Sequence, residues 1–437
     1  MVAVPFETAL ATAGVGRFQR RLLGIFGLVW AADAMQVLAI GFTAPSIAAT
    51  FGLTVPQALQ TGTAFFLGML IGASLFGRLA DRFGRRRVLI VTVLIDAVFG
   101  ILSAFAPDFA WLLALRFLTG LGVGGTLPVD YAMMAEFLTP DRRGRWLVIL
   151  EGFWAVGTVA VALIAWAAQA SGVEAPWRTI FFFTALPALV GIVLRFWVPE
   201  SPLYLLRTGQ AGKARAVLDR IARTNGRPAP SADLAEAAGG KAGLRALFSP
   251  GLLRTSLLIL ATWFLVSVSY YGIFVWLPSR LAGEGFGFVR GNLFLVVLAL
   301  AQIPGYALAA YGVERWGRRP TLIGFLLLSA AGCFLYSLTT SAPLVATSMM
   351  VMSFALLGTW GSLYAFTPEL YPTTLRATGM GAAGTMARLG GLLAPSAMAP
   401  VIASGFGFAL AVFAGLLVIA AGAVAAIGVE TRNVPLR

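Results

Sequence analysis

The sequence predicts an all-α membrane protein with twelve transmembrane helices in two pseudo-symmetric halves of six. Two observations support this fold class. Of the 437 residues, 59% are apolar and 11% are charged, with a mean hydropathy of +0.86, and a soluble domain of this size does not bury so much apolar surface. Two charged motifs also recur at the same offset in the second half of the chain, which indicates an internal duplication.

Twelve apolar runs are long enough to cross a bilayer, which takes about 20 residues. The first six are residues 22–45, 57–79, 88–105, 109–134, 146–168 and 177–198. The second six are residues 252–277, 288–311, 321–338, 344–366, 378–402 and 406–429. Prolines near the ends of several runs, such as Pro56, Pro107 and Pro320, are typical of helix boundaries.

A polar segment at residues 199–250 separates the two sets of runs. It divides the chain into an N-terminal six-helix bundle at 1–198 and a C-terminal six-helix bundle at 251–437. Its residues 202–206 and 213–223 have the pattern of short amphipathic helices that lie on a membrane face. We interpret the segment as a cytoplasmic linker between repeats; a regulatory domain is the alternative.

The net charge of +14 follows the topology of the helices. Most arginines flank alternate hairpins, which is the positive-inside pattern, and Arg178, Arg280 and Arg290 are the arginines placed in outward loops. We therefore expect both termini in the cytoplasm and no nucleic-acid partner. We also expect a monomer in the cell (inner) membrane. Because three arginines precede the first apolar run, we expect that run to be a retained helix rather than a cleaved signal.

The composition also argues against an enzyme. The chain has no histidine and one cysteine, Cys333, which lies inside an apolar run. Disulfides and thiolate metal sites are thereby excluded, and no nucleophile–base set is visible. We expect no cofactor and no metal.

The strongest motif lies between the second and third runs and reads Gly77-Arg-Leu-Ala-Asp81-Arg82-Phe-Gly84-Arg85-Arg86-Arg87. A weaker copy between the eighth and ninth runs contains Glu314-Arg315-Trp-Gly317-Arg318-Arg319. A second pair of motifs follows the fourth and tenth runs, with Glu136 and Arg142-Arg143 in one and Glu369 and Arg376 in the other. One offset relates both pairs, since it takes position 81 to 314, 136 to 369 and 143 to 376. We call this step along the chain the repeat offset.

With these motifs the chain resembles the major facilitator superfamily over essentially its whole length. Residues 77–87 match the signature that this family has between its second and third helices, and residues 116–124 resemble its fourth-helix motif. Residues 127–131, 270–272, 364–372 and 388–391 resemble the group of niacin permease, synaptic vesicle glycoproteins and organic-ion transporters. The resemblance implies two six-helix bundles around a central cavity that opens alternately to each side.

The resemblance also implies an inner gate whose salt bridges form in the outward-open state and break in the inward-open state. The gate residues are Gly77, Asp81, Arg82, Arg85, Arg86, Glu136, Arg142, Arg143, Glu314, Arg318, Glu369 and Arg376. The glycine-rich stretch at 120–125 is not a phosphate loop, since it follows no strand and lacks the Lys-Ser/Thr ending. Small residues at this place let helices approach closely.

Three charged residues lie deep in apolar runs and have no charged counterpart in the repeat. Applied to Asp33, Arg116 and Arg388, the repeat offset gives Val266, Met349 and Ala155. Ionisable groups in hydrocarbon are costly and functional by default. Groups that break the symmetry are better candidates for substrate and ion binding than the repeated gate residues. Asp96 and Glu151 are further buried acids, next in line as proton carriers.

Asp33 is interpreted as the proton carrier. Burial raises the pKa of a carboxylate in general and a nearby cation lowers it, so a site that pairs Asp33 with Arg116 in one state only takes up and releases a proton. The resemblance implies the same roles, since related symporters use a first-helix acid near a fourth-helix Arg. A static ion pair is the alternative. Gln36 stands where many aromatic-acid symporters have a second acid, which leaves coupling and stoichiometry open.

Arg388 is interpreted as the anchor for a carboxylate, because a guanidinium fork matches that group; a packing role beside Gly390 is the alternative. Aromatic residues on the expected cavity helices could stack on a flat substrate. Together with Gln36, the candidates for this role are Tyr270, Tyr271, Trp360 and Tyr364.

These features favour proton-coupled uptake of a small organic anion, such as nicotinate or a benzoate. A sugar transporter is less favoured because the helices contain few amides, and a drug antiporter because the fifth run lacks its Gly-x-x-x-Gly-Pro pattern. An organic-cation transporter would need an acid in place of Arg388. A non-transporting membrane receptor is the alternative from another class.

Overall fold

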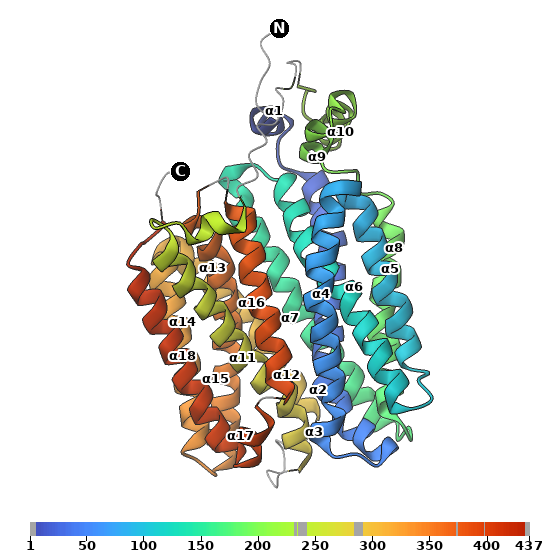
Figure 1. Ribbon diagram of the computed structural model, residues 1–437, viewed down its shortest axis with the longest axis vertical. Coiled ribbons are helices and arrows are strands. Elements are labelled where there is room, and N and C mark those ends of the chain that lie inside the picture. The colour runs from blue at the N-terminus through green and yellow to red at the C-terminus, as the bar shows by residue number, and fades with distance from the viewer. Residues whose placement is uncertain are drawn as a thin grey trace.

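The computed structural model describes residues 6–230, 234, 243–283, 292–372, 375–396 and 398–432, and long helices dominate it (Figure 1). The first half contains α2 (Arg17–Phe51), α4 (Gln60–Phe83), α5 (Arg85–Ser103), α6 (Phe109–Glu136), α7 (Pro140–Ala170) and α8 (Pro176–Arg195). The second half contains α11 (Leu253–Gly283), α12 (Asn292–Leu300) followed by α13 (Gln302–Arg315), α14 (Arg318–Ser337), α15 (Ala342–Phe366), α16 (Arg376–Ser396) and α18 (Phe406–Ile427).

Ten spans in the described part of the chain are long and apolar enough to cross a membrane. With α5 and α16 they make up the twelve predicted helices. Two of the expected runs are divided or shortened. The eighth run is divided at Ala301 into α12 and α13, and the eleventh ends at Ser396 before the short α17 (Ala399–Ala403). Arg280 and Arg290, predicted in outward loops, have side chains outside the described residues.

Proline does not end these helices as often as the sequence indicated. Pro45, Pro128, Pro187 and Pro278 lie inside α2, α6, α8 and α11. A membrane helix tolerates proline where neighbouring helices satisfy the freed backbone groups. Helix α2 therefore runs for 35 residues to Phe51, and Gly52 ends it in the left-handed conformation with φ 65°.

Short helices lie at the end of the molecule that carries both termini, which we call the terminal face (Figure 1). They are α1 (Phe6–Ala13), α9 (Pro202–Arg207) and α10 (Ala211–Asn225). Asn225 joins this layer to the first half, because its Nδ2 donates to the Gly14 carbonyl (2.7 Å) and its Oδ1 accepts from the Phe18 amide (2.9 Å). On the same face of α10 as Asn225, Leu218 and Ile221 are buried.

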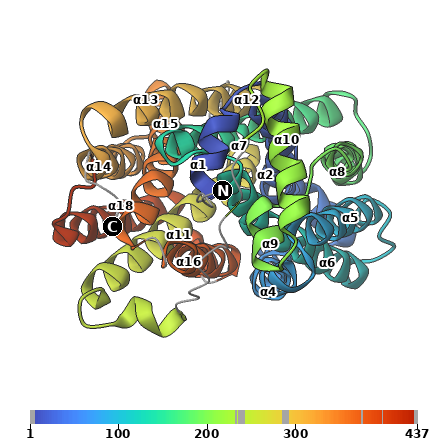
Figure 2. The ribbon, with the colours of Figure 1, turned by 90° about the horizontal axis from the view of Figure 1, so that it is seen from above.

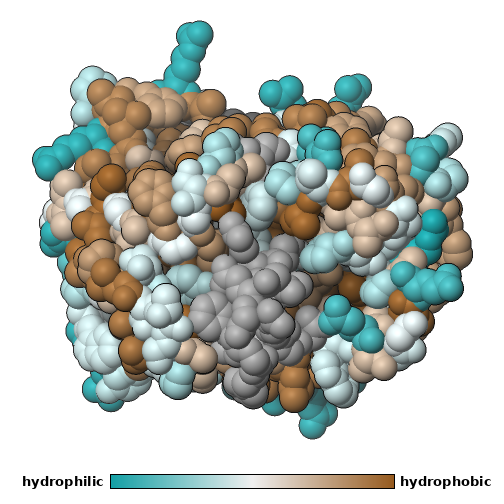
Figure 3. Space-filling model, turned by 90° about the horizontal axis from the view of Figure 1, so that it is seen from below, coloured by the Kyte–Doolittle hydropathy of each residue, from teal (hydrophilic) through white to brown (hydrophobic). Residues whose placement is uncertain are grey.

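The two halves stand side by side, and α1, α9 and α10 cover part of the terminal face (Figure 2). The halves meet where α4 packs on α16, α7 on α12, and α2 on α11. On the face opposite the termini, hydrophilic side chains gather mainly around the rim, between hydrophobic areas (Figure 3). The short α3 (Val55–Ala58) lies at that end of the molecule.

Glycines bring α4 and α6 into backbone contact. A Cβ atom on Gly120 would lie 2.0 Å from the Phe65 carbonyl oxygen, and one on Gly124 would lie 2.1 Å from that of Met69. From α4, a Cβ on Gly68 would lie 2.1 Å from the Phe117 carbonyl oxygen. No side chain fits such spaces, so the prediction that the glycine-rich stretch serves helix packing is confirmed.

Candidate functional site

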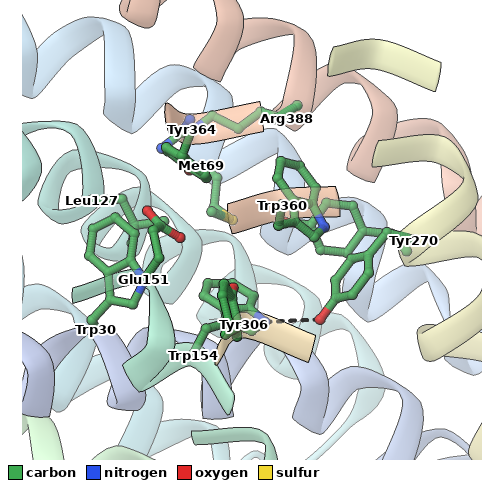
Figure 4. Close-up of a pocket in the computed structure, with 12 residues that line it drawn as sticks. Trp30, Met69, Leu127, Glu151, Trp154, Tyr270, Tyr306, Trp360, Tyr364 and Arg388 are labelled. Atoms are coloured by element: carbon green, nitrogen blue, oxygen red, sulfur yellow. Dashed lines mark hydrogen bonds between the residues drawn. The ribbon is translucent and has the colours of Figure 1, made fainter. Parts of the chain in front are cut away.

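A cavity lies between the two halves near the middle of the long helices (Figure 4). Its wall is formed by α2, α4, α6 and α7 from the first half and α11, α13, α15 and α16 from the second. The lining residues are Trp30, Met69, Leu127, Glu151, Trp154, Tyr270, Tyr271, Tyr306, Trp360, Tyr364, Ala387 and Arg388. The wall is thus mainly aromatic, with one basic and one acidic side chain among the residues described.

The four aromatic residues selected from the sequence all lie on this wall: Tyr270, Tyr271, Trp360 and Tyr364. The Trp154 indole Nε1 donates to the Tyr270 hydroxyl (2.9 Å), which links α7 to α11 across the cavity (Figure 4). Behind them, Trp263 contacts Tyr364 with ring centroids 4.8 Å apart, and its Nε1 donates to Thr367 Oγ1 (2.8 Å). These contacts fix the rings, so the wall is shaped before any ligand binds.

The aromatic wall is itself partly symmetric. The repeat offset relates Trp30 to Trp263 and Tyr131 to Tyr364. Within each half the two rings are neighbours, at 6.1 Å for Trp30 and Tyr131 and 4.8 Å for Trp263 and Tyr364. The two tyrosines meet each other at 5.5 Å. Sequence reasoning missed Trp30 and Tyr306, although applying the repeat offset to the aromatic residues could have found Trp30.

Arg388 reaches the cavity from the middle of α16, and its side chain lies along Tyr364 (Figure 4). The residue is 8% exposed. Its Nη1 donates to the Gly384 carbonyl one turn earlier (2.8 Å), whereas its Nε has no hydrogen-bond partner in the described part of the chain. A buried N–H of a cation without an acceptor is costly, and an anion bound in the cavity that Arg388 lines could supply that acceptor.

Asp33 is fully buried on α2, one turn beyond the cavity-lining Trp30 and on the same face of the helix. It is not itself on the cavity wall. Asp33 is close enough to Arg388 for their charges to interact. Two of the charges that break the internal repeat therefore lie on helices that line one cavity, α2 and α16.

Arg116 occupies a different environment, inside the first half. Its Nη1 donates to Gln36 Oε1 (2.7 Å) and its Nη2 to the Gln36 carbonyl (2.9 Å). Its guanidinium lies between the rings of Phe65 and Phe181, at 4.6 and 4.5 Å, and its charge interacts with that of Asp96. Neither Arg116 nor Gln36 lines the cavity. The pairing of Asp33 with Arg116 in one state stays a prediction.

Glu151 is the acid on the cavity wall, and the sequence had ranked it only as a reserve proton carrier. It comes from α7, on the side of the cavity where Trp30 and Leu127 lie (Figure 4). The residue is 3% exposed, and its Oε1 has no hydrogen-bond partner among the residues described. No one-dimensional signal distinguished it from Asp96, because both are single acids in apolar runs.

At the terminal face, each half contains an arginine–glutamate ion pair beside a second glutamate that binds the first amides of a helix. We call this arrangement the carboxylate clamp. In the first half Arg85 forms an ion pair with Glu136, which also accepts a hydrogen bond from the Ser201 hydroxyl. The neighbouring Glu200 accepts from the Arg85 amide (3.0 Å) and the Arg86 amide (3.2 Å) at the start of α5. Sequence reasoning had paired Glu136 with Arg142 or Arg143. The Arg142 side chain lies outside the described residues, and Arg85 is the partner that the structure records.

The second half repeats this clamp with a threonine in place of the serine. Arg318 pairs with Glu369 (3.0 Å), and the Thr431 hydroxyl donates to Glu369 (2.6 Å). Glu430 accepts from the amides of Arg318 (2.9 Å) and Arg319 (3.1 Å) at the start of α14. Both hairpins turn at a glycine with positive φ, at Gly84 (98°) and Gly317 (109°), as the motif predicts.

The other predicted gate residues lie near the clamps. Arg86 Nη2 donates to the Phe196 carbonyl (3.0 Å), and Arg143 Nε to that of Ala135 (3.0 Å). Arg376 Nε donates to the Tyr371 carbonyl (3.3 Å). The remaining ones are Gly77, Asp81, Arg82 and Glu314, which lie at the ends of α4 and α13 on the same face. Their part in gating stays a prediction.

Comparisons with known proteins agree with this architecture. A model of the Major Facilitator Superfamily matches residues 22–395. The niacin transporter NiaP of Acinetobacter baylyi is 35% identical and aligns over 96% of both chains. The putative niacin/nicotinamide transporter NiaP of Bacillus subtilis is 34% identical over 96% of this chain and 98% of its own. A synaptic vesicle 2-related protein of Xenopus laevis is 33% identical over 98% of this chain and 81% of its own.

Solved structures share the fold. The xylose transporter XylE from E. coli, in a partially occluded inward-open conformation, superposes with a TM-score of 0.75 over 96% of this chain and 100% of its own. The sequences are 19% identical, so this likeness concerns the fold alone.

Proposed function

Because this chain belongs to the Major Facilitator Superfamily, we propose that it moves a small organic anion across a membrane by alternating access, together with a proton. The family, the relatives and the fold make it a multi-pass membrane protein and a secondary transporter rather than an enzyme. The class of substrate, an aromatic monocarboxylate such as nicotinate or a benzoate, and the coupling to protons are our proposal.

The observation that carries the proposal is Arg388. Its guanidinium reaches an aromatic cavity while one buried N–H lacks an acceptor among the described residues. A carboxylate supplies that acceptor, and the rings of Tyr271 and Tyr364 offer faces on which a flat substrate can stack. Two relatives that align over nearly their whole length are named for niacin, which is itself an aromatic monocarboxylate.

The interaction of Asp33 with Arg388 supports proton coupling through the same site. When Asp33 is ionised, it competes with a substrate anion for the positive charge of Arg388. A proton on Asp33 removes that competition, so proton and anion bind more tightly together than apart. In this scheme Arg116 donates to Gln36 and is a fixed cation behind the site. Its positive charge favours the ionised form of Asp33.

The terminal face is proposed to be cytoplasmic, since the arginine-rich hairpins and the carboxylate clamps lie there. In this scheme the clamps hold each bundle rigid while the bundles rock about the cavity. The proposed domain boundaries remain at residues 198 and 250. A monomer in the cell membrane, without a nucleic-acid partner, completes the proposal.

The test is the affinity of purified Arg388→Ala for benzoate and nicotinate. Loss of a charge-assisted hydrogen bond costs about 1.5–3 kcal/mol, so the dissociation constant should rise roughly 10- to 100-fold. Arg388→Lys should lie between, because an ammonium cannot form the bidentate contact. Arg254→Ala is the control: this exposed arginine donates to the Ala426 carbonyl at the end of α18. Unchanged affinity of Arg388→Ala for every carboxylate tested contradicts the anchor role.

Uptake into proteoliposomes separates a transporter from a receptor. A transporter accumulates labelled carboxylate when an inward proton gradient is applied, whereas a receptor only binds it. Binding without accumulation under any gradient would refute proton-coupled transport.

A further inference from the structure

The function proposed above leaves Glu151 without a role. It lies on the cavity wall together with Arg388, and it is 3% exposed. Its Oε1 has no hydrogen-bond partner in the part of the chain that the structure describes. A buried carboxyl oxygen without a partner is costly, so a group from outside the protein is the natural candidate to complete it.

The surroundings of Glu151 are aromatic. Tyr271, Tyr306 and Tyr364 line the same cavity, and the Tyr131 ring lies 5.5 Å from that of Tyr364. Trp30 and Trp154 complete the same part of the wall (Figure 4). Tyrosine and tryptophan faces attract cations and the electron-poor rings of protonated heterocycles. No arginine or lysine among the described residues forms an ion pair with Glu151, so a static salt bridge does not account for it.

The internal repeat gives a geometric reason why Glu151 and Arg388 act as a pair. They lie on equivalent helices, α7 and α16, and the repeat offset relates Glu151 to Gly384 and Arg388 to Ala155. When the repeat offset places both residues on α7, at positions 151 and 155, the acid and the base are about one helical turn apart. They line the cavity from opposite halves, and the Gly384 carbonyl accepts a hydrogen bond from Arg388 Nη1 (2.8 Å).

We propose that Glu151 binds a basic nitrogen of the substrate, so that the cavity selects amphoteric aromatic molecules with a carboxylate for Arg388 and a nitrogen for Glu151. One proton lies between the carboxyl group and the nitrogen. Either the acid O–H donates to a neutral ring nitrogen, or the carboxylate accepts from the protonated ring, and both arrangements satisfy the buried oxygen. This inference rests on the proposed role of Arg388 as carboxylate anchor.

The test compares two probes of the same shape and the same carboxylate, benzoate and pyridine-3-carboxylate, which differ by the ring nitrogen. The wild-type protein should bind the pyridine probe about tenfold more tightly, as one added hydrogen bond to a charged group allows. Glu151→Leu should bind both probes alike. Glu174→Gln, in an exposed acid just beyond α7, is the matched control and should keep the preference.

A Glu151→Leu protein that retains the tenfold preference overturns the inference. If this variant does not fold, Glu151→Met decides. Its thioether keeps about the size of the side chain but has no donor and is only a weak acceptor, so the preference should fall at least threefold, and an unchanged ratio overturns the inference. Equal binding of both probes by wild type refutes the nitrogen site and leaves the Arg388 anchor standing. Binding of neither probe refutes the proposed function, and this inference with it.

Discussion

The two halves touch at Gly41 of α2, and this contact predicts how the cavity is closed from the face opposite the termini. A Cβ atom on Gly41 would lie 2.5 Å from the Val275 carbonyl oxygen in α11. Ordinary contact begins at 3.4 Å, so in Gly41→Ala the helices must part by about 0.9 Å. Overpacking of this kind costs about 1–3 kcal/mol. A change of about 2 kcal/mol shifts a two-state equilibrium roughly 30-fold toward the form in which α2 and α11 are apart.

Thiol labelling from the side that the proposed topology places outside the cell measures this shift. The chain has one cysteine, and Cys333 is buried, so its background reaction is low. Ala387→Cys places a thiol on the cavity wall, and an impermeant maleimide then reports how often the opposite face is open. In the Gly41→Ala background, labelling should accelerate at least several-fold.

The matched control is Gly24→Ala in the same helix, since a Cβ there meets nothing within 4 Å. Both changes raise helix propensity by the same amount, so only the contact with α11 differs between them. Equal labelling rates in the two variants would refute the conclusion that this contact closes the opposite face.

Two further predictions concern the proton and the clamps. Asp33→Asn should retain counterflow exchange in proteoliposomes and lose accumulation driven by a pH gradient, because an amide neither takes up nor releases a proton. Full accumulation would assign the proton to another acid. Glu369→Gln removes the ion pair with Arg318 and weakens the bond from Thr431, so it should lower stability by about 1–3 kcal/mol. Glu136→Gln should do the same in the other half, and apparent unfolding temperatures equal to wild type in both variants would show that the clamps do not hold the bundles together.

The sequence alone determined the twelve helices, the duplication and the role of the glycines at 120–125. These features depend on the length of apolar runs and on spacing along the chain, which a single sequence contains. It also identified Arg388 and four of the aromatic residues on the cavity wall. A charge or a polar ring in hydrocarbon has few tolerable positions, so its presence already points to the interior of the protein.

Partners of the charged residues were decided only in three dimensions. Arg116 binds Gln36 and approaches Asp96, while Asp33 interacts with Arg388. Which side chains meet depends on the rotation of each helix about its axis. That rotation is set by contacts such as those of Gly120 and Gly124 with α4, and no spacing along the chain reveals it.

The second clamp also could not be predicted from spacing along the chain. Glu430 and Thr431 repeat Glu200 and Ser201 in space. The step along the chain from Glu200 to Glu430 is shorter than the repeat offset, so the repeat does not align them. Folding brings both segments to the start of a helix, where two free backbone N–H groups favour a carboxylate. The chemistry of a helix end selected these residues, and only the tertiary structure shows that they are equivalent.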